Sequence, residues 1–321
     1  MKAIVYFKYG SPDVLEMREI DMPAIEDDHV LVKVHAASLN PFDWHLTRGV
    51  PYFMRAFAGM SKPRNTSLGI DLAGTIEAFG RNVTQFHPGD EVFGQGAGAC
   101  AEYVGAKADQ IAPKPSNLSF EEAAAVPVAA TTALQSLRGK GRLHRGQAIL
   151  VNGAAGGVGT FAVQIAKSLG AEVTGVCSTR NVDMVRSIGA DHVLDYLVED
   201  FTRTGQRYDL ILDAVGNRSL SDLRRALTPK GTLRLVGGGG DHWLGPMPLL
   251  LRALVVSPFV RQRLAPVGAK VSKEDLLVLR QLIEDGKLTP VIDLTFAFGE
   301  AAEALRYLEA GHARGKVVIT V

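Results

Sequence analysis

The residues best suited to chemistry form a glycine-rich turn between Asn152 and Gly159. The apolar run 149–151 before the turn predicts a buried strand, and apolar residues at helical spacing over 157–169 predict a helix after it. Backbone N–H groups and the helix dipole at such a turn favour an anion, most often a dinucleotide pyrophosphate. The alternative is a strand–helix turn that binds nothing. The predicted phosphate-binding residues are Gly153, Ala154, Ala155, Gly156, Gly157 and Val158.

This turn departs from the G-x-G-x-x-G pattern at one place, because Ala154 replaces the first glycine. Gly156 and Gly159 hold the other two places, and a second strand is predicted over 172–176. A glycine motif alone is weak support, since glycines also serve ordinary tight turns. The order strand, turn, helix and strand favours the dinucleotide interpretation.

Polar residues suited to a phosphate follow the second predicted strand, as Ser178, Thr179 and Arg180. An NAD site usually has a carboxylate here for the ribose 2′-hydroxyl, and none ends this strand. The two hydroxyls can donate hydrogen bonds, and the guanidinium suits a 2′-phosphate. The sequence therefore predicts NADPH over NADH. The alternative, helix capping by Ser178 and Thr179 with a solvated Arg180, is compatible with phosphate binding.

A third group of candidate residues mixes polar and aromatic side chains over 40–63, a composition that suits a cleft wall better than a core strand. It contains Asn40, Asp43, Trp44, His45, Tyr52 and Phe53.

The elements that must position these residues predict an α/β fold in two parts. Strands and helices alternate from 149 to 236, which indicates parallel strands in a doubly wound sheet. Short strands separated by turns over residues 1 to about 120 indicate a small, β-rich, barrel-like module.

Composition limits the compartment and the partners. The 321 residues carry a formal charge of +1, so bulk charge favours neither nucleic acid nor anionic membranes. Cys100 and Cys177 cannot form a disulfide framework or, by themselves, a thiolate zinc site. A strand is predicted directly at 3–7, so we expect no signal peptide and a cytoplasmic protein. Prolines and Arg252 interrupt the most apolar window, 244–260, so we expect no membrane span.

Several short stretches of the sequence, taken in order, resemble the medium-chain dehydrogenase/reductase superfamily, and most closely its zinc-free quinone oxidoreductase branch. The matching strings are 39–44, 69–74, 88–94, 152–159, 189–193, 213–216 and 315–319. The resemblance implies a GroES-like catalytic domain over 1–122 and 272–321 and a Rossmann NADPH-binding domain over 123–271. It also implies a homodimer or homotetramer, with the cofactor in the cleft between domains.

The resemblance also implies that there is no catalytic zinc. Zinc-dependent relatives place a cysteine at Asn40, Gly-His-Glu at 69–71 and a third thiolate near 127–128, and this chain has none of them. Without a Lewis acid, alcohol oxidation is disfavoured. We interpret His35, His45 and His87 as packing or surface residues.

Other roles are implied by the resemblance alone. Asn40 would hold the nicotinamide ribose or amide, and Thr132 would lie near the nicotinamide. Tyr52 would donate a hydrogen bond to a developing oxyanion, with a lining residue as the alternative. Tyr196 would pack by the adenosine, or be an ordinary half-buried tyrosine. The remaining implied cofactor contacts are Val215, Gly237 and Gly238, although 237–240 also suits a mobile loop.

The implied reaction is hydride transfer from NADPH to a quinone or an α,β-unsaturated carbonyl, with the small-molecule acceptor held in a dry cleft. Two alternatives stay open: an enoyl-thioester reductase of the same superfamily, and a non-enzymatic NADPH-binding protein. The window 244–266 is a candidate substrate-side lid or subunit contact, or else a buried core segment.

Overall fold

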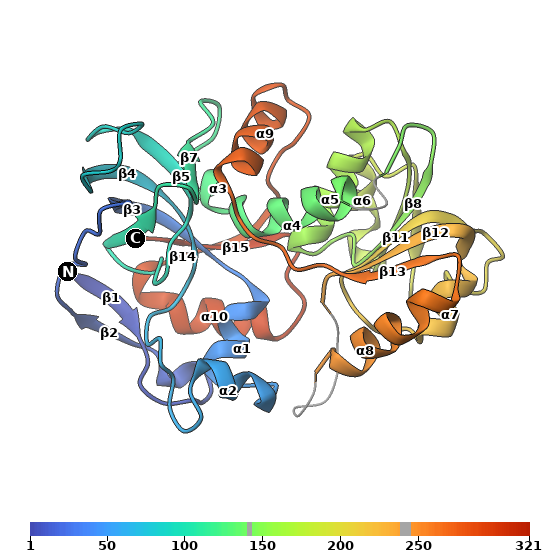
Figure 1. Ribbon diagram of the computed structural model, residues 1–321, viewed down its shortest axis with the longest axis horizontal. Helices are drawn as coiled ribbons and strands as arrows, with labels where there is room; N and C mark the ends of the chain where they lie inside the picture. The colour runs from blue at the N-terminus through green and yellow to red at the C-terminus, as the bar shows by residue number, and fades with distance from the viewer. Residues whose placement is uncertain (140–142, 238–244) are drawn as a thin grey trace. The chain divides into compact units, whose positions relative to one another are not determined.

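The protein divides into two compact units in the computed structural model, which describes residues 1–139, 143–237 and 245–321 (Figure 1). The first unit contains Met1–Thr131 and Lys270–Val321, so it is built from both ends of the chain. The second contains Thr132–Ala269. The chain passes between them at Thr131 and Thr132, within helix α4 (Pro127–Arg138), whereas the family resemblance implied a boundary after residue 122.

The first unit is built on two sheets. A seven-stranded sheet runs in the order β14-β15-β3-β4-β5-β7, with β6 paired to β3, and a smaller sheet pairs β1 with β2. The antiparallel register of β15 and β3 sets Val317 opposite Leu39, which brings Lys316 beside Asn40. The strands are β1 (Lys2–Val5), β2 (Glu16–Glu19), β3 (His29–Leu39), β4 (Asp71–Phe79), β5 (Glu91–Gln95), β6 (Tyr103–Lys107), β7 (Ile111–Pro113), β14 (Ile292–Ala297) and β15 (Lys316–Thr320).

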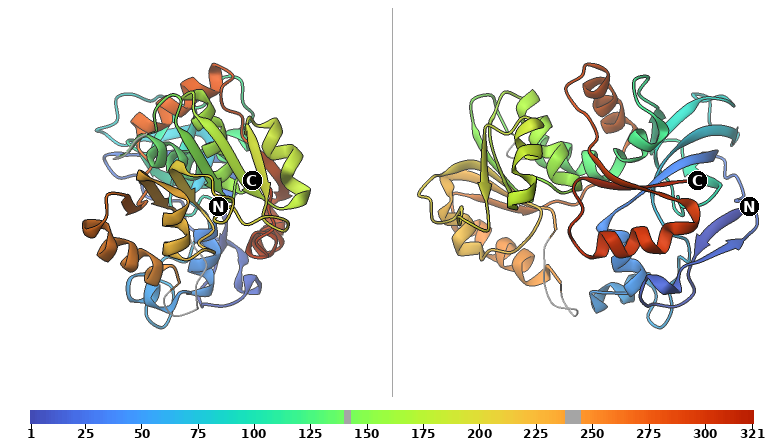
Figure 2. Two further views of the ribbon diagram at one scale, coloured as in Figure 1. Left: turned by 90° about the vertical axis from the view of Figure 1, so that its right-hand side faces the viewer. Right: turned by 180° about the vertical axis from the view of Figure 1, so that it is seen from behind.

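Short helices cover the first unit. The segment expected to form a cleft wall is mostly helical, because Pro41 suits the first helical position and the Asn40 N–H donates to Asp43 Oδ2 at 2.7 Å. Helix α10 packs against β14, β15 and α1, as the right-hand view of Figure 2 shows. The helices are η1 (Pro12–Val14), α1 (Pro41–Arg48), η2 (Tyr52–Met54), α2 (Arg55–Ala58), α3 (Phe120–Ala124), α9 (Lys273–Glu284), η5 (Phe298–Glu300) and α10 (Ala301–Glu309).

The second unit contains the predicted doubly wound sheet, which in the described residues has six parallel strands in the order β10-β9-β8-β11-β12-β13. Helices α5 and α6 lie on one face and α7 and α8 on the other (Figures 1 and 2). The strands are β8 (Ala148–Asn152), β9 (Glu172–Cys177), β10 (His192–Asp195), β11 (Tyr208–Asp213), β12 (Leu227–Leu235) and β13 (Arg263–Pro266). The helices are α5 (Gly157–Ser168), η3 (Thr179–Asn181), α6 (Val182–Ser187), α7 (Leu220–Arg225), α8 (Met247–Val256) and η4 (Ser257–Phe259).

The strands of this sheet are continuous apolar runs because both faces of the sheet are buried. Leu150, Ile211 and Leu233 are all fully buried, as expected for parallel strands covered by helices on both faces. The carboxyl ends of β8, β9 and β11 share one edge, so every residue that follows them is delivered to that edge.

The window proposed as lid or core forms α8, η4 and β13 over its described residues. Ala253 is fully buried in the core of the second unit, whereas Val255 and Phe259 are largely exposed. One side of the segment is therefore core, and a lid or subunit contact on the other side stays a prediction.

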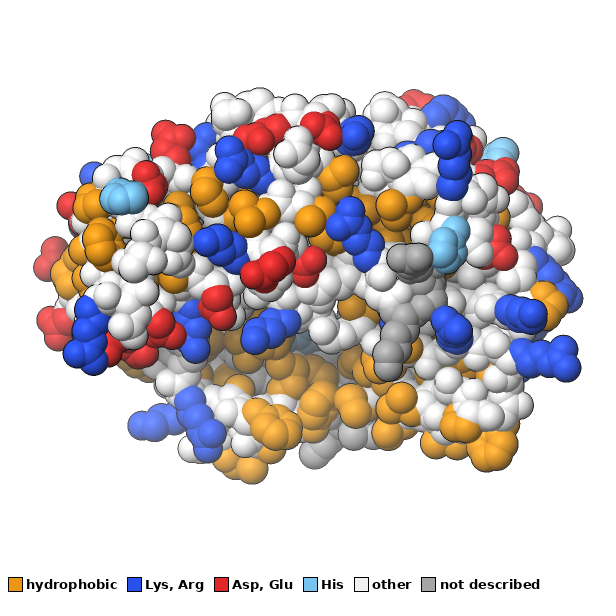
Figure 3. Space-filling view, turned by 45° about the horizontal axis from the view of Figure 1, so that its top comes forward, with side chains coloured by type: hydrophobic (Ala, Val, Ile, Leu, Met, Phe, Trp, Pro, Cys, Tyr) orange, Lys and Arg blue, Asp and Glu red, His pale blue; other side chains and the backbone are white. Residues whose placement is uncertain are grey.

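Acidic and basic side chains are interspersed on the face drawn in Figure 3, in keeping with the small net charge. No helix in the described part of the chain is both long enough and apolar enough to cross a membrane.

Candidate functional site

The glycine-rich turn joins β8 to α5, as predicted. Gly153 has a φ of +89°, and Gly156 is the extended residue that precedes the helix. A Cβ on Gly159 would lie 2.0 Å from the Gly153 carbonyl oxygen, so the backbone fold of the turn excludes a side chain there. The turn thus presents the N-terminus of a 12-residue helix at the carboxyl edge of the sheet, a geometry that fits a pyrophosphate.

The alanine that replaces the first glycine of the pattern is accommodated by a glycine on the next strand. Ala154 is fully buried, and a Cβ built on Gly175 of β9 would lie 3.0 Å from its methyl group. The methyl group therefore fills space beside the strand, and the turn keeps its course.

The end of β9 places Ser178, Thr179 and Arg180 at the same edge. Asn181 donates to Ser178 Oγ at 3.1 Å, while the Ser178 side chain makes no capping hydrogen bond to the described backbone after it. Capping by this hydroxyl, the alternative considered above, is therefore not what the structure shows for Ser178.

The second strand itself ends without a carboxylate, but a neighbouring strand brings one to this edge, which the sequence analysis did not foresee. Asp195 ends β10 and is paired in register with Cys177 at the end of β9. Its Oδ2 accepts a 2.5 Å hydrogen bond from Thr179 Oγ1. The local sequence around Arg180 gave no sign of it, because Asp195 comes from the neighbouring strand. Tyr196, the next residue, donates its backbone N–H to the Cys177 carbonyl at 3.0 Å and leaves its side chain about half exposed.

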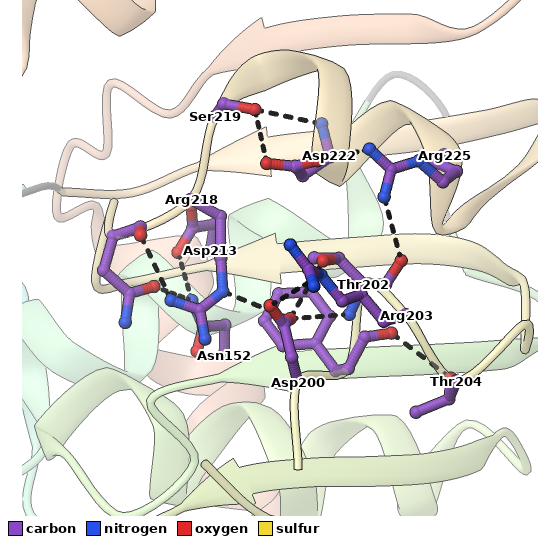
Figure 4. Close-up of polar contacts among 12 residues, drawn as sticks. Asn152, Asp200, Thr202, Arg203, Thr204, Asp213, Arg218, Ser219, Asp222 and Arg225 are labelled. Atoms are coloured by element: carbon purple, nitrogen blue, oxygen red, sulfur yellow. Dashed lines mark hydrogen bonds and ion pairs between the residues drawn. The ribbon is translucent and has the colours of Figure 1, made fainter. Parts of the chain in front are cut away.

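A buried aspartate at the end of β11 shapes the next loop (Figure 4). Asp213 Oδ1 accepts from Asn152 Nδ2 at 2.8 Å and from the backbone N–H groups of Val215 at 3.1 Å and Gly216 at 2.9 Å. Its Oδ2 is buried and has no partner among the described residues. Asp213 thereby fixes the backbone that carries Val215, a predicted cofactor contact. Val215 in turn lies close to the glycine-rich turn, because a Cβ on Gly153 would lie 2.8 Å from the Val215 side chain.

In the first unit, Asn40 belongs to a buried polar cluster. Its Nδ2 donates to Asp71 Oδ2 at 2.9 Å, and its Oδ1 accepts from Lys316 Nζ at 2.8 Å. Lys316 Nζ also donates to the Leu39 carbonyl at 3.1 Å and lies 3.3 Å from Asp71 Oδ2. Asp71 further accepts from Ser38 Oγ and the Val128 N–H. The cluster therefore joins β3, β4, β15 and the start of α4.

Asp43 lies fully buried beside this cluster. Burial raises the pKa of its carboxyl to about 7, with Asp71 adding repulsion and the Asn40 N–H and Lys316 opposing the shift. The sequence suggested that Asp43 caps or orients its loop, and the hydrogen bond from the Asn40 N–H agrees with that role.

Three other predicted site residues have their own local surroundings. Tyr52 begins η2, is partly exposed and has the Arg55 guanidinium 4.8 Å from its ring centroid. Thr132 is buried within α4, where its carbonyl accepts from Ser136 Oγ at 2.6 Å. Among the described residues, a Cβ on Gly237 would meet the Ala214 carbonyl oxygen at 3.7 Å and nothing nearer. Gly238 lies outside the described residues.

The histidines considered for zinc have ordinary environments. His35 forms a 2.9 Å hydrogen bond with Thr75 Oγ1, and its ring lies 4.4 Å from that of Phe120 in a tilted arrangement. Burial lowers the pKa of its imidazole. His45 stacks on Trp44 with centroids 3.6 Å apart. Within the described ranges, the one group of three or more His, Cys, Asp or Glu side chains close enough to share a metal is Glu26, Asp28 and His29, away from Asn40.

Comparisons with known proteins agree with this architecture. A family model described as "Alcohol dehydrogenase GroES-like domain" matches residues 26–116, and one described as "Zinc-binding dehydrogenase" matches 188–319. The 2-methylene-furan-3-one reductase of Solanum lycopersicum is 35% identical over 99% of this chain and 79% of its own. The chain belongs to the medium-chain dehydrogenase/reductase superfamily.

Other members place it in the quinone-oxidoreductase-like branch of that superfamily. The solved structure of the Coxiella burnetii quinone oxidoreductase has a TM-score of 0.87 and 31% identity, covering 100% of this chain and 99% of that one. The NADPH-dependent alkenal/one oxidoreductase, chloroplastic, of Arabidopsis thaliana is 34% identical over 99% of this chain and 79% of its own. The predicted superfamily, its quinone-oxidoreductase-like branch and the fold class are confirmed, while activity without zinc stays a prediction.

Proposed function

We propose that this protein is an NADPH-dependent oxidoreductase that reduces a quinone or an α,β-unsaturated carbonyl by hydride transfer, without zinc. Its similarity to quinone and alkenal/one oxidoreductases supports the oxidoreductase activity and NADPH. NADPH, when bound, supplies the hydride, and the protein supplies binding, orientation and electrostatics.

The second unit would hold the dinucleotide. The N-terminus of α5 and the backbone of 153–158 suit the pyrophosphate. Ser178, Thr179 and Arg180 suit the 2′-phosphate, and the Thr179 hydroxyl would have to give up its hydrogen bond to Asp195 to donate there. Val215 and Gly237 follow the neighbouring strands at the same edge of the sheet. Thr132, Tyr196 and Gly238 complete the residues that we assign to cofactor binding.

One observation carries the choice of acceptor: the Lys316 ammonium lies 2.8 Å from Asn40 Oδ1 and 3.3 Å from Asp71 Oδ2. Zinc-dependent relatives place a cysteine and a glutamate at these two positions. A fixed ammonium repels a second cation, and amide and carboxylate oxygens are a poor set for zinc beside it. The donor set therefore favours an acceptor that is already electron-poor over an alcohol that needs a Lewis acid.

The side chains of the protein then have few roles in the reaction itself. Addition of hydride to the β-carbon of an enone leaves negative charge on the carbonyl oxygen, which needs a hydrogen-bond donor, and the α-carbon takes a proton. We assign Asn40 to the nicotinamide ribose or amide. Tyr52 donates to the oxyanion or only lines the site, and solvent can protonate the α-carbon.

An NADPH-consumption assay with quinones, small enones and enoyl thioesters tests the proposal. Turnover of quinones or small enones is the expected result. Selective turnover of enoyl thioesters would favour the thioester reductase, and tight NADPH binding without any turnover would favour a non-enzymatic binding protein.

We also propose a cytoplasmic homodimer or homotetramer that acts on small molecules. The family resemblance supports the assembly, which sedimentation equilibrium of the purified protein would test. The Arabidopsis relative is named as chloroplastic, so localisation of a tagged chain is the direct test of compartment.

A further inference from the structure

The buried ion pair of Lys316 and Asp71 encloses the side chain of Asn40. The Lys316 side chain is 3% exposed and that of Asp71 is 0% exposed. The two residues come from β15 and β4, which both pair with β3, and Asn40 follows directly after β3. The amide of Asn40 thus has an ammonium on its oxygen side and a carboxylate on its nitrogen side.

This arrangement selects one of the two orientations of the amide. An ammonium can only donate hydrogen bonds, and an ionised carboxylate can only accept them. Rotating the amide by half a turn would set its NH₂ against Lys316 and its oxygen against Asp71, which replaces two hydrogen bonds by two repulsive contacts. The buried environment strengthens both effects, because the surrounding dielectric is low.

The selected orientation leaves a defined donor. Asp71 takes one of the two Nδ2 protons of Asn40, and the other has no acceptor in the described part of the chain. With the amide turned the other way, Lys316 would face the NH₂ group. The amide oxygen would then receive no hydrogen bond from the Lys316 ammonium.

We propose that Lys316 is a positioning residue for the reaction: together with Asp71 it locks the Asn40 amide, so that the second Nδ2 proton is the group offered to the nicotinamide or the acceptor. This inference rests on the proposed function. Lys316 touches neither the cofactor nor the acceptor, and it acts through Asn40.

A purely structural lysine in the same unit provides a matched control. Lys114 has a side chain that is 7% exposed, donates to the Leu118 carbonyl at 2.6 Å and pairs with Glu91 at 3.2 Å. Neither of these partners is Asn40 or Asp71. Replacing each lysine by methionine removes a buried ammonium and keeps most of the side-chain volume, so both variants should lose thermal stability.

We expect the Lys316→Met and Lys114→Met variants to differ in kcat. Lys316→Met should lower kcat for NADPH consumption by at least about tenfold, with NADPH Kd changed less than about threefold, whereas Lys114→Met should keep kcat within about twofold. In an Asn40→Ala background, Lys316→Met should have little further effect on kcat, because both substitutions remove the same donor. Equal losses of kcat with and without Asn40 would overturn the proposal.

The double variant Lys316→Met/Asp71→Asn guards against a failure to fold, since it removes both members of the buried ion pair together. Compared with Lys316→Met, the double variant should be more stable to heat and should keep the low kcat. The separate variant Lys316→Arg should have a higher kcat than Lys316→Met. Recovery of full kcat in the double variant would contradict the proposal.

A readout independent of turnover separates this inference from the proposed function. Neutron crystal structures without ligand distinguish the nitrogen of the Asn40 amide from its oxygen, which ordinary X-ray structures do not. The NH₂ group of Asn40 should face residue 71 in the wild type, and the amide should lose this single orientation in the double variant. If the wild type reduces no acceptor, the proposed function fails, while an ordered wild-type amide that becomes disordered in the variant still supports the lock. An unchanged amide in the variant would refute the lock by itself.

Discussion

The hydroxyl of Thr179 donates a 2.5 Å hydrogen bond to Oδ2 of Asp195, so a carboxylate lies at the edge of the sheet that carries Arg180. An aspartate at this edge weakens the attraction for a 2′-phosphate, because like charges repel. The same carboxylate holds Thr179 and accepts from the Leu197 N–H at 2.9 Å. Asp195 therefore orders this edge, and we expect it also to reduce the preference for NADPH.

Asp195→Asn separates these two effects, since the amide keeps an acceptor for Thr179 and loses the charge. We expect NADPH to bind about two- to tenfold more tightly and NADH to change little. Fluorescence titration at low and high salt measures both Kd values, and the gain should shrink at high salt. Weaker NADPH binding in this variant would mean that the charge orders the edge more than it repels the phosphate.

Arg180→Ala tests the group assigned to the 2′-phosphate. A hydrogen bond to a charged group is worth about 1.5–3 kcal/mol, so NADPH Kd should rise about 10- to 100-fold, with NADH within about twofold. Arg186→Ala is the matched control, because Arg186 lies nearby on α6 and pairs with the exposed Asp183. Unchanged NADPH affinity and preference in Arg180→Ala would remove the assignment.

Gly159→Ala tests the turn. The added Cβ would lie 2.0 Å from the Gly153 carbonyl oxygen and 2.8 Å from the Ala154 Cα, both backbone atoms that cannot move alone. We expect a loss of about 2–4 kcal/mol of unfolding free energy and NADPH binding at least about tenfold weaker. Gly268→Ala, whose Cβ would meet nothing within 4 Å, should change neither. Urea unfolding and titration check both variants, and a stable, NADPH-binding Gly159→Ala would contradict this account of the turn.

The sequence could predict the second unit because its signals are local. Periodicity and the glycine turn indicate β8, α5 and β9 from consecutive residues, and the alternation of elements then implies the parallel sheet. The helices α1 and α2 were missed, since aromatic and polar residues over 40–63 carry no clear apolar period. Tertiary packing determines such short helices more than propensity does.

The polar clusters could not be predicted because their members meet only through strand order and register. Lys316 and Asn40 are 276 positions apart, and they are neighbours because β15 pairs with β3 in one register. Thr179 and Asp195 meet because β9 and β10 end together. One signal was present in the sequence: Val193, Leu194 and Asp195 read as a strand ending in a carboxylate at the edge where parallel strands end.

Asp43 gives the protein a pH-dependent stability. Its carboxyl is fully buried, and burial raises its pKa from 3.8 to about 7. Below about pH 4 the carboxyl is protonated in both folded and unfolded chains, and its contribution to stability is complete. Between about pH 4 and 7 the unfolded chain loses this proton while the folded chain keeps it, so stability falls as the pH rises. Above pH 7 the contribution is lost.

Asp43→Asn removes this dependence while keeping an acceptor for the Asn40 N–H. The unfolding free energy of the variant, relative to wild type, should rise by up to roughly 4 kcal/mol between pH 4 and pH 8, at about 1.4 kcal/mol for each unit of pKa change. Urea unfolding at several pH values measures it. Asp285→Asn is the control: the Lys287 hydrogen bond lowers the pKa of Asp285, so the stabilisation by this carboxylate is complete above about pH 4 and is lost only at lower pH. The difference between Asp285→Asn and wild type should therefore stay constant between pH 4 and pH 8. A pH-independent difference between Asp43→Asn and wild type would mean that Asp43 is ionised in the folded protein throughout this range, held there by Lys316 and the Asn40 N–H.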